Sequence, residues 1–383
     1  MSTCGIFRIV GSVALAAALV CVPSAAYSQE NRTSDPSEFS SLSGEELFQT
    51  ACSNCHGLDG TGSPQYRLGF EDELPDFTDC TFASREPDAD WVAVAHEGGP
   101  LRVFSERMPA FGDALSEEDL SRVMEYIRTF CTDKSWPRGE LNMPRAMFTE
   151  KAYPEDEAVF TTGTALDGPG SIASEFVYEK RIGSLSQIEI VVPFVVQQID
   201  EPSGRNWASG VGDIVLGLKR VFFHSVNSGS ILSAAAELKV PTGDDERGFG
   251  SGTTTFEGFV SHGQALPAEF FLQLQGIVEL PFDTDRAENE AAVRAAIGRS
   301  FTQGQWGRTW TPMVEVLAGK DLVSGSQVHW DLVPQFQVTL NKRQHIMANL
   351  ALRIPVNETA GRNPRLLVYV LWDWFDGGLF DGW

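Results

Sequence analysis

Positive charge is scarce in this 383-residue chain, where 29 Lys and Arg stand against 52 Asp and Glu for a formal net charge of −23. Neutralising phosphates requires a basic surface, so the composition argues against a nucleic-acid-binding protein. Cysteine is also scarce, and six residues are too few for a disulfide-dense scaffold. Hydrophobic residues still make up 42% of the chain, which excludes wholesale disorder and allows one large domain or two ordinary ones.

One apolar run stands out near the N-terminus. Residues Ile9–Val20 are followed by the small-residue segment Ala26–Ser28, an order typical of a secretory signal peptide, which we predict for residues 1–28. An uncleaved anchor helix would need a longer run, and a lipoprotein would need a smaller residue before Cys21. Export places the remaining cysteines in an oxidising compartment; they are Cys52, Cys55, Cys80 and Cys131.

The periodicity of the chain then changes from helical to alternating. Residues 29–42 are polar and Ser-rich and predict a flexible linker. A helical pattern covers residues 43–135, and it includes a helix that Ser116 caps. Residues 136–154 contain three X-Pro pairs among mixed charges and predict a second linker. From residue 155 to residue 383 apolar and polar residues alternate, which predicts antiparallel strands.

The alternating runs have the length and composition of membrane strands. We count about twelve runs of about 10–12 residues, enough to cross a bilayer at a tilt. The segments 187–197, 269–280, 327–341 and 346–356 each place apolar residues on one face, and the last run, 366–375, is rich in aromatic residues. We therefore predict an outer-membrane β-barrel of about 12 strands over residues 155–383. A soluble, lipid-binding β-domain is the alternative.

In such a barrel the polar side chains of the strands must face the lumen or water. The residues expected there are Glu189, Asp213, Lys219, Glu237, Lys239, Glu279, Glu315, His329, Asp331, Asn349 and Arg353.

The strongest chemical signal is the pentapeptide Cys52-Ser53-Asn54-Cys55-His56. Two cysteines three positions apart project from the same side of a starting helix, so both thiols can bond one haem, and His56 can bind its iron. This Cys-x-x-Cys-His pattern is the attachment motif of haem c. A redox dithiol would require a strand–turn–helix context, and a zinc site would require a second ligand pair; we find neither. One covalently attached haem c is therefore predicted, with Cys52, Cys55 and His56 as its binding residues.

The iron needs a sixth ligand if the haem is an electron carrier. Met108 is the best candidate, because Pro109 fixes a turn that can direct the thioether toward the iron. The other donors considered are His96, Met124 and Met143.

Residues 43–135 resemble the class I c-type cytochromes, which are all-α domains that carry one haem. The resemblance rests on Gly44-x-x-Leu47-Phe48, Cys52-x-x-Cys55-His56-Gly57, Gly60-Thr61-Gly62-Ser63-Pro64, Leu74-Pro75-Asp76-Phe77-Thr78, Met108-Pro109-Ala110-Phe111 and Tyr126-Ile127. It implies that the first and last helices cross near Gly44 and that Phe48 packs on Tyr126 or Ile127. It also implies that the Pro64 carbonyl accepts a hydrogen bond from His56. By the same resemblance, the pocket lining includes Phe77, Trp91 and Phe111.

Cys80 and Cys131 depart from the plain pattern of that family. Two remaining thiols in one exported domain predict a disulfide that closes a loop between residues 80 and 131; two separate buried thiols are the alternative. The β-region in turn resembles the outer-membrane barrels of the hydrophobic-substrate uptake kind, in segments such as Gly212–Lys219 and Leu238–Gly243.

Together these features predict a two-domain electron carrier and not an enzyme. We expect a single-haem cytochrome in the periplasm of a Gram-negative bacterium, anchored to the outer membrane by the barrel. Residues 29–150 carry 10 basic and 24 acidic residues, a net charge of −14, so the expected partners are a redox protein donor and acceptor with a basic patch. The alternatives are a porin or transporter with an accessory redox module, and a five-coordinate, catalytic haem.

Overall fold

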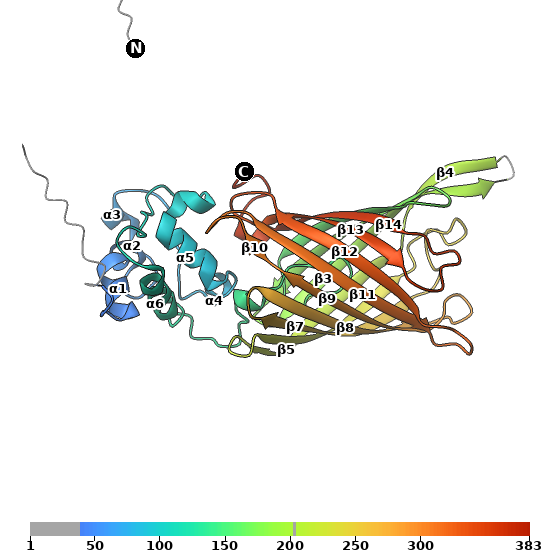
Figure 1. The fold of residues 1–383 in the computed structure, drawn as a ribbon, viewed down its shortest axis with the longest axis horizontal. Helices are drawn as coiled ribbons and strands as arrows, with labels where there is room; N and C mark the ends of the chain where they lie inside the picture. The colour runs from blue at the N-terminus through green and yellow to red at the C-terminus, as the bar shows by residue number, and fades with distance from the viewer. Residues whose placement is uncertain (1–38, 202–203) are drawn as a thin grey trace, which may run out of the picture. The chain divides into compact units, whose positions relative to one another are not determined.

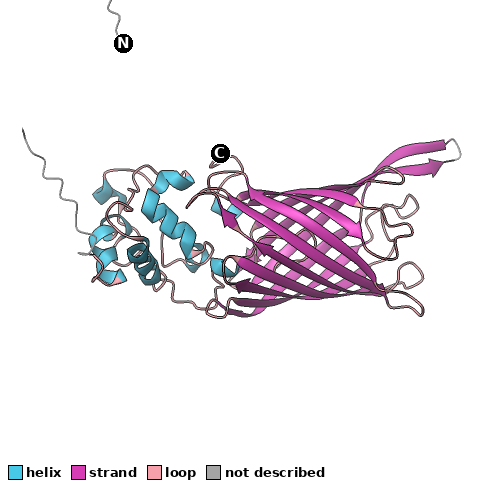
Figure 2. Cartoon of the chain, viewed as in Figure 1, coloured by secondary structure: helices cyan, strands magenta, loops and turns pink. Residues whose placement is uncertain are grey.

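The computed structural model describes residues 39–201 and 204–383. The predicted signal peptide and most of the predicted 29–42 linker lie outside the described residues. The described residues belong to one unit, which begins with helices and continues as a β-barrel (Figures 1 and 2). The helical elements are α1 (Gly44–Ala51), α2 (Ser53–His56), α3 (Gln65–Leu68), α4 (Cys80–Ala83), α5 (Asp88–Glu97), η1 (Gly99–Arg102), α6 (Glu117–Ile127), η2 (Gly139–Leu141) and η3 (Trp374–Asp376).

Two capping boxes start the helices that frame the helical domain. Ser43 and Glu46 cap α1, and Ser116 and Asp119 cap α6, each pair satisfying backbone N–H groups of the first turn. The two helices meet at Gly44, where a Cβ atom would lie 2.0 Å from the carbonyl oxygen of Arg122. Only glycine permits this approach, so the crossing implied by the cytochrome resemblance is present. None of the helices in the described residues is long and apolar enough to span a membrane.

The remaining chain forms a closed antiparallel barrel. Its strands are β1 (Glu157–Ala165), β2 (Ser171–Ile182), β3 (Ser186–Glu201), β4 (Gly204–Val211), β5 (Ile214–Ser225), β6 (Ser230–Val240), β7 (Thr255–Leu266), β8 (Phe270–Pro281), β9 (Glu290–Arg299), β10 (Phe301–Thr302), β11 (Thr309–Asp321), β12 (His329–Thr339), β13 (Ile346–Pro355) and β14 (Arg365–Asp373). β14 pairs with β1 and closes the sheet. Because β4 and β5 both pair with β3, and β9 and β10 both pair with β11, the described residues form 12 wall positions. The predicted fold class and strand number are confirmed.

The wall of the barrel is apolar outside and polar inside. On β3 the side chains of Ile188, Ile190 and Phe194 are exposed. The opposite face holds buried polar groups such as Gln187, and several expected lumen residues are buried as well, namely Lys219, Glu315, Asp331 and Asn349. Asp213 differs from expectation, because it lies between β4 and β5 and accepts hydrogen bonds from the backbone of Gly243 and Ser251. The alternation thus fits a barrel with lipid outside it.

The segment between the helical domain and the first strand lies inside the lumen. For residues 136–154 the sequence predicts only a linker, yet 11 of the 16 residues from 141 to 156 are buried. The backbone of this segment bonds to strand side chains around the wall: Phe148 N–H donates to Glu315 of β11, and Glu150 N–H donates to Gln275 of β8. We call residues 141–156 the lumen strap. The strap is therefore attached to the barrel wall from inside the lumen.

Candidate haem site

The two motif cysteines and the histidine lie on one turn of helix. α2 contains only residues 53–56, and the N–H of His56 donates to the carbonyl of Cys52 (3.0 Å). Both Cys52 and Cys55 are free thiols, half-buried on the same turn. Gly57 has a positive φ of 74°, which turns the chain so that Ser63 N–H reaches the Cys55 carbonyl (2.7 Å). This local fold presents two thiols and an imidazole together, as attachment of one haem requires.

His56 is suited to bind iron as a neutral imidazole. Burial lowers the pKa of His56 to about 4, so the ring is uncharged near pH 7. Its Nδ1 atom is buried without a hydrogen-bond partner. The expected bond to Pro64 is therefore absent from this structure, where the Pro64 carbonyl accepts from Arg67 N–H (2.9 Å) instead. Burial, together with the neighbouring Cys55, also raises the pKa of Cys52 to about 11.

Aromatic rings surround the imidazole. Phe77 stacks on His56, with ring centroids 5.0 Å apart, and Trp91 lies 5.4 Å from Phe77. Phe48 packs on Tyr126 at 5.5 Å, as the cytochrome resemblance implies. The apolar cluster that contains Phe48 and Phe77 also includes Cys52, Trp91, Met108 and Phe111. An interior of this kind fits a large flat apolar cofactor.

The cluster also distinguishes the candidate sixth ligands. Met108 lies at its half-buried edge, in a loop whose ends are joined by a bond from Gly99 N–H to the Met108 carbonyl (3.1 Å). Met124 is buried within α6, and Met143 packs in the barrel with Phe271 and Met313. The His96 ring is held by Glu97 (2.8 Å). Met108 is therefore the donor that the fold leaves at the edge of the His56 pocket.

A disulfide joins Cys80 to Cys131 in the structure, with the Cα atoms 5.1 Å apart. It ties the start of α4 to the residues that follow α6. Next to it, Arg128 packs over the Trp91 ring (4.3 Å) and bonds to Asp88 (2.8 Å). These contacts stiffen the side of the domain that carries Trp91.

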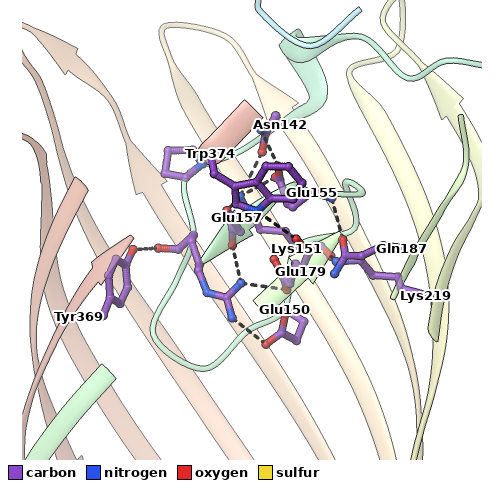
Figure 3. A network of polar contacts seen from close by, with 12 residues as sticks. Asn142, Glu150, Lys151, Glu155, Glu157, Glu179, Gln187, Lys219, Tyr369 and Trp374 are labelled. Atoms are coloured by element: carbon purple, nitrogen blue, oxygen red, sulfur yellow. Dashed lines mark hydrogen bonds and ion pairs between the residues drawn. The ribbon is translucent and has the colours of Figure 1, made fainter. Parts of the chain in front are cut away.

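A network of polar contacts lies inside the barrel (Figure 3). Arg145 of the lumen strap pairs with Glu157 of β1 (2.6 Å) and Glu179 of β2 (3.3 Å), and both carboxylates are fully buried. Lys151 pairs with Glu157 (2.9 Å) and Glu155 (2.6 Å). Because an unpaired buried charge is costly, these ion pairs fix the strap to the wall.

Glutamates also line up across the barrel wall. In register across neighbouring strands lie Glu179, Glu189, Glu237, Glu257, Glu279 and Glu290, with Gly217 between the second and the third. Like charges directly opposite each other are destabilising. Lys239 lies 3.6 Å from Glu279, and His329 lies 3.8 Å from Glu290. This part of the barrel wall is therefore strongly acidic, and its Glu179 and Glu189 lie close to Glu150 of the strap.

Two barrel residues that contact the cytochrome domain have no signal in the sequence. Trp306, in the turn between β10 and β11, packs against the apolar cluster that contains Phe48 and Phe77. Arg343, in the turn between β12 and β13, bonds to the Arg102 and Val103 carbonyls. More than 170 residues separate each from these contacts, so no local pattern could predict them.

Comparisons with known proteins agree with this division of the chain. Residues 41–127 match the family described as cytochrome C oxidase, cbb3-type, subunit III, and residues 171–350 match the family described as putative MetA-pathway of phenol degradation. No curated protein matches the chain.

Solved outer-membrane proteins are similar to the barrel region. An outer membrane channel from Pseudomonas putida F1 has 13% identity and a TM-score of 0.40, covering 60% of this chain and 99% of that chain. The KdgM porin in complex with disordered oligogalacturonate has 9% identity and a TM-score of 0.38, covering 56% and 98%. LpxR from Salmonella typhimurium has 8% identity and a TM-score of 0.38, covering 56% and 99%.

The N-terminal region is therefore a c-type cytochrome domain, which implies that it binds haem and has redox partners. The C-terminal region is a closed antiparallel barrel with 12 wall positions among the described residues.

Proposed function

We propose that this protein is a one-electron carrier whose single haem c faces the periplasm, held to the outer membrane by its own barrel. One arrangement carries the proposal: Cys52, Cys55 and His56 share one turn beside an apolar cluster that has Met108 at its edge. Haem bound there supplies a ferrous–ferric couple. Cys52 and Cys55 would hold it covalently, and His56 and Met108 would bind the iron.

The lengths of the barrel turns support a periplasmic cytochrome. The N-terminal ends of β1, β3 and β8 and the C-terminus of β14 lie at the end nearer the helical domain. The turns at that end are short, such as 183–185 and 267–269. At the opposite end the connections are longer, such as 241–254 and 282–289. In outer-membrane barrels the short turns are periplasmic and the long loops extracellular.

The surface near the motif supports docking of a basic redox partner. Leu58 and Tyr66 are exposed next to the motif turn and α3. Hydrogen bonds from Thr61 and Thr78 lower the pKa of Asp59 and Asp76, so both stay ionised. An apolar patch with an acidic border is the surface that a basic carrier recognises, and long-range attraction speeds the encounter.

Ligation of the iron by Met108 is tested with carbon monoxide, which needs a free coordination position on the ferrous iron. The full-length protein, purified in detergent with its haem, should resist carbon monoxide when reduced, and Met108→Ala should bind it readily. If the unsubstituted protein already binds carbon monoxide as fast as Met108→Ala, the six-coordinate carrier is wrong and a catalytic, five-coordinate haem replaces it.

Electron transfer from a protein partner is tested by measuring the reduction rate at different ionic strengths. Reduction by a small basic redox protein should slow as ionic strength rises from 0.01 to 0.15 M, because the Debye length shrinks from about 30 to about 8 Å. A neutral small-molecule reductant is the matched control and should show a constant rate. Equal behaviour of the two donors would remove the acidic docking surface from the proposal.

The acidic lumen favours a second function, passage of cations through the barrel. The lumen strap argues against this function, because the strap lies inside the barrel and the ion pairs of Arg145 and Lys151 with Glu157 hold it there. Single-channel recording in a planar bilayer separates the two. A silent barrel supports the anchor, whereas steady cation-selective current from the unsubstituted protein supports a porin with an accessory cytochrome.

A further inference from the structure

The loop that carries Met108 is a closed unit whose two ends are bonded together. After α5 the chain turns at Gly98, where φ is +85° and a Cβ atom would lie 2.9 Å from the Met108 carbonyl oxygen. Gly99 N–H donates to that carbonyl, and Phe104 N–H donates to the Gly99 carbonyl (2.9 Å). A displacement of η1 is therefore passed directly to the backbone of Met108.

The end of η1 has a strained backbone. Its last carbonyl groups also have no hydrogen-bond partner within the helix itself. Val103 has φ of +58°, in the left-handed region, which is unfavourable for a β-branched residue. A helix end also leaves its last carbonyls unsatisfied within the helix. Such a conformation persists only when surrounding groups hold it.

Arg343 of the barrel supplies those groups. Its Nε donates to the Arg102 carbonyl (3.2 Å), its Nη2 donates to the Val103 carbonyl (3.1 Å), and its guanidinium lies over the Phe104 ring (4.6 Å). A planar guanidinium can make these three contacts at once, which a lysine cannot.

The other side of the same turn is held by a second barrel residue. Arg102, buried and paired with Asp90 (3.0 Å), donates from Nη1 to the Trp306 carbonyl (2.8 Å). The Trp306 ring lies 5.9 Å from the His96 ring, at the end of α5 just before Gly98. The two barrel turns that carry Arg343 and Trp306 thus both make hydrogen bonds to η1 or to the residue that ends it.

Arg343 is itself fixed within the barrel. Its Nη1 donates to the Asp376 carbonyl (2.9 Å), and the neighbouring Lys342 N–H donates to the Gly382 carbonyl (2.6 Å). The C-terminal residues therefore brace the turn from which Arg343 extends. This makes the contact to η1 a rigid one rather than that of a free surface side chain.

We propose that Arg343 is a positioning residue for the sixth ligand of the haem iron, so that the barrel controls how firmly Met108 is held. The inference rests on the proposed function, since it requires Met108 to bind iron. Loss of Arg343 frees η1, raises the population in which Met108 has left the iron, and lowers the reduction potential, because Met ligation raises it.

The test compares the haem-loaded, full-length protein with Arg343→Ala in detergent. Two hydrogen bonds from a charged donor are lost, so we expect the rate of carbon monoxide binding to the ferrous form to rise at least about tenfold. The reduction potential should fall, and the far-red absorption of the ferric Met–iron bond should weaken. Arg343→Lys should lie between the two proteins.

Arg299→Ala is the matched control. Arg299 is also a barrel arginine that donates to a carbonyl, that of Ala268 (2.9 Å), and packs over the Phe270 and Phe301 rings. Its potential and carbon monoxide rate should equal those of the unsubstituted protein. Heat-modifiable migration on a gel reports the folded barrel in each variant.

Each result has a distinct meaning. If Arg343→Ala has a folded barrel but the unsubstituted potential and carbon monoxide rate, the inference is overturned while the proposed function stands. If the unsubstituted protein binds carbon monoxide readily, both fail. If Arg343→Ala does not fold, Phe104→Leu removes only the stacked, partly exposed ring, and it must raise the carbon monoxide rate for the inference to stand.

Discussion

The two domains of this chain place their apolar and polar residues in opposite ways. In the helical domain Phe48, Phe77 and Leu120 are buried in an apolar interior. In the barrel Phe160 and Phe176 are exposed, while Glu157 and Glu179 are fully buried. Under the proposed function each arrangement requires a component from outside the chain: haem would lie in the first interior, and lipid would cover the second exterior. The contrast shows that one physical rule, burial of apolar surface, gives opposite patterns in opposite solvents.

Removal of the iron ligand should separate the two domains most clearly. We expect His56→Ala to remove the imidazole ligand of the iron, to lower the haem content and to loosen the helical domain, in whose interior the haem is proposed to lie. The barrel should keep its heat-modifiable migration and membrane location. Haem content and gel migration measure the two effects in one preparation. A barrel that fails to fold without haem would show that the domains depend on each other.

The ion pairs of the lumen provide the next largest effect. Arg145→Ala leaves the Glu157 and Glu179 carboxylates buried without this partner, so it should destabilise the barrel by about 3–5 kcal/mol. Urea unfolding in lipid vesicles measures this change. Arg138→Ala is the control, because Arg138 pairs with Asp88 (2.6 Å) at a partly exposed position and should cost at most about 1 kcal/mol. Equal losses would mean that the buried position of Arg145 is unimportant.

Reduction of the disulfide tests the helical domain alone. The bridge between Cys80 and Cys131 closes a loop of 51 residues, for which chain entropy gives about 4 kcal/mol of stabilisation. We expect the helical domain to melt earlier after reduction while the barrel is unaffected. Alkylation should label two thiols after reduction. Labelling of Cys80 or Cys131 without reductant would contradict the bridge.

The outer face of the barrel gives the smallest of these effects. Leu350 is exposed on β13, and Leu350→Arg should cost about 2–4 kcal/mol if this position lies at the centre of the bilayer. Leu379→Arg, the same change outside the strands, is the control and should have little effect. The difference in urea midpoint between the two variants measures the lipid contact. Equal midpoints would indicate a soluble β-domain instead.

Local chemistry explains which parts of the structure the sequence predicts. The pentapeptide at residues 52–56, the Ser116 cap and the two-residue alternation are signals within a few residues, and the structure places a short helix, α6 and the strands where they indicate. The lumen strap has no such signal. Its charges and prolines are those of a linker in water, and only the polar walls of a barrel make their burial favourable.

The contacts of Arg343 and Trp306 could not be predicted for another reason. They join segments more than 200 residues apart, and their partners on η1 are mainly backbone carbonyls. Backbone groups carry no sequence signature, so the pairing is visible only in three dimensions. The residues around His56 are predicted better than the barrel contacts that hold η1, because the former are grouped around one sequence motif.

The most direct test of the account is a haem stain of the outer-membrane fraction after denaturing electrophoresis. We predict a stained band at the size of the mature full-length chain, which keeps its colour through acidic acetone extraction and migrates faster when the sample is not heated. Colour that is lost on extraction, or that appears only in the soluble periplasmic fraction, would contradict a covalent haem carried by a membrane barrel.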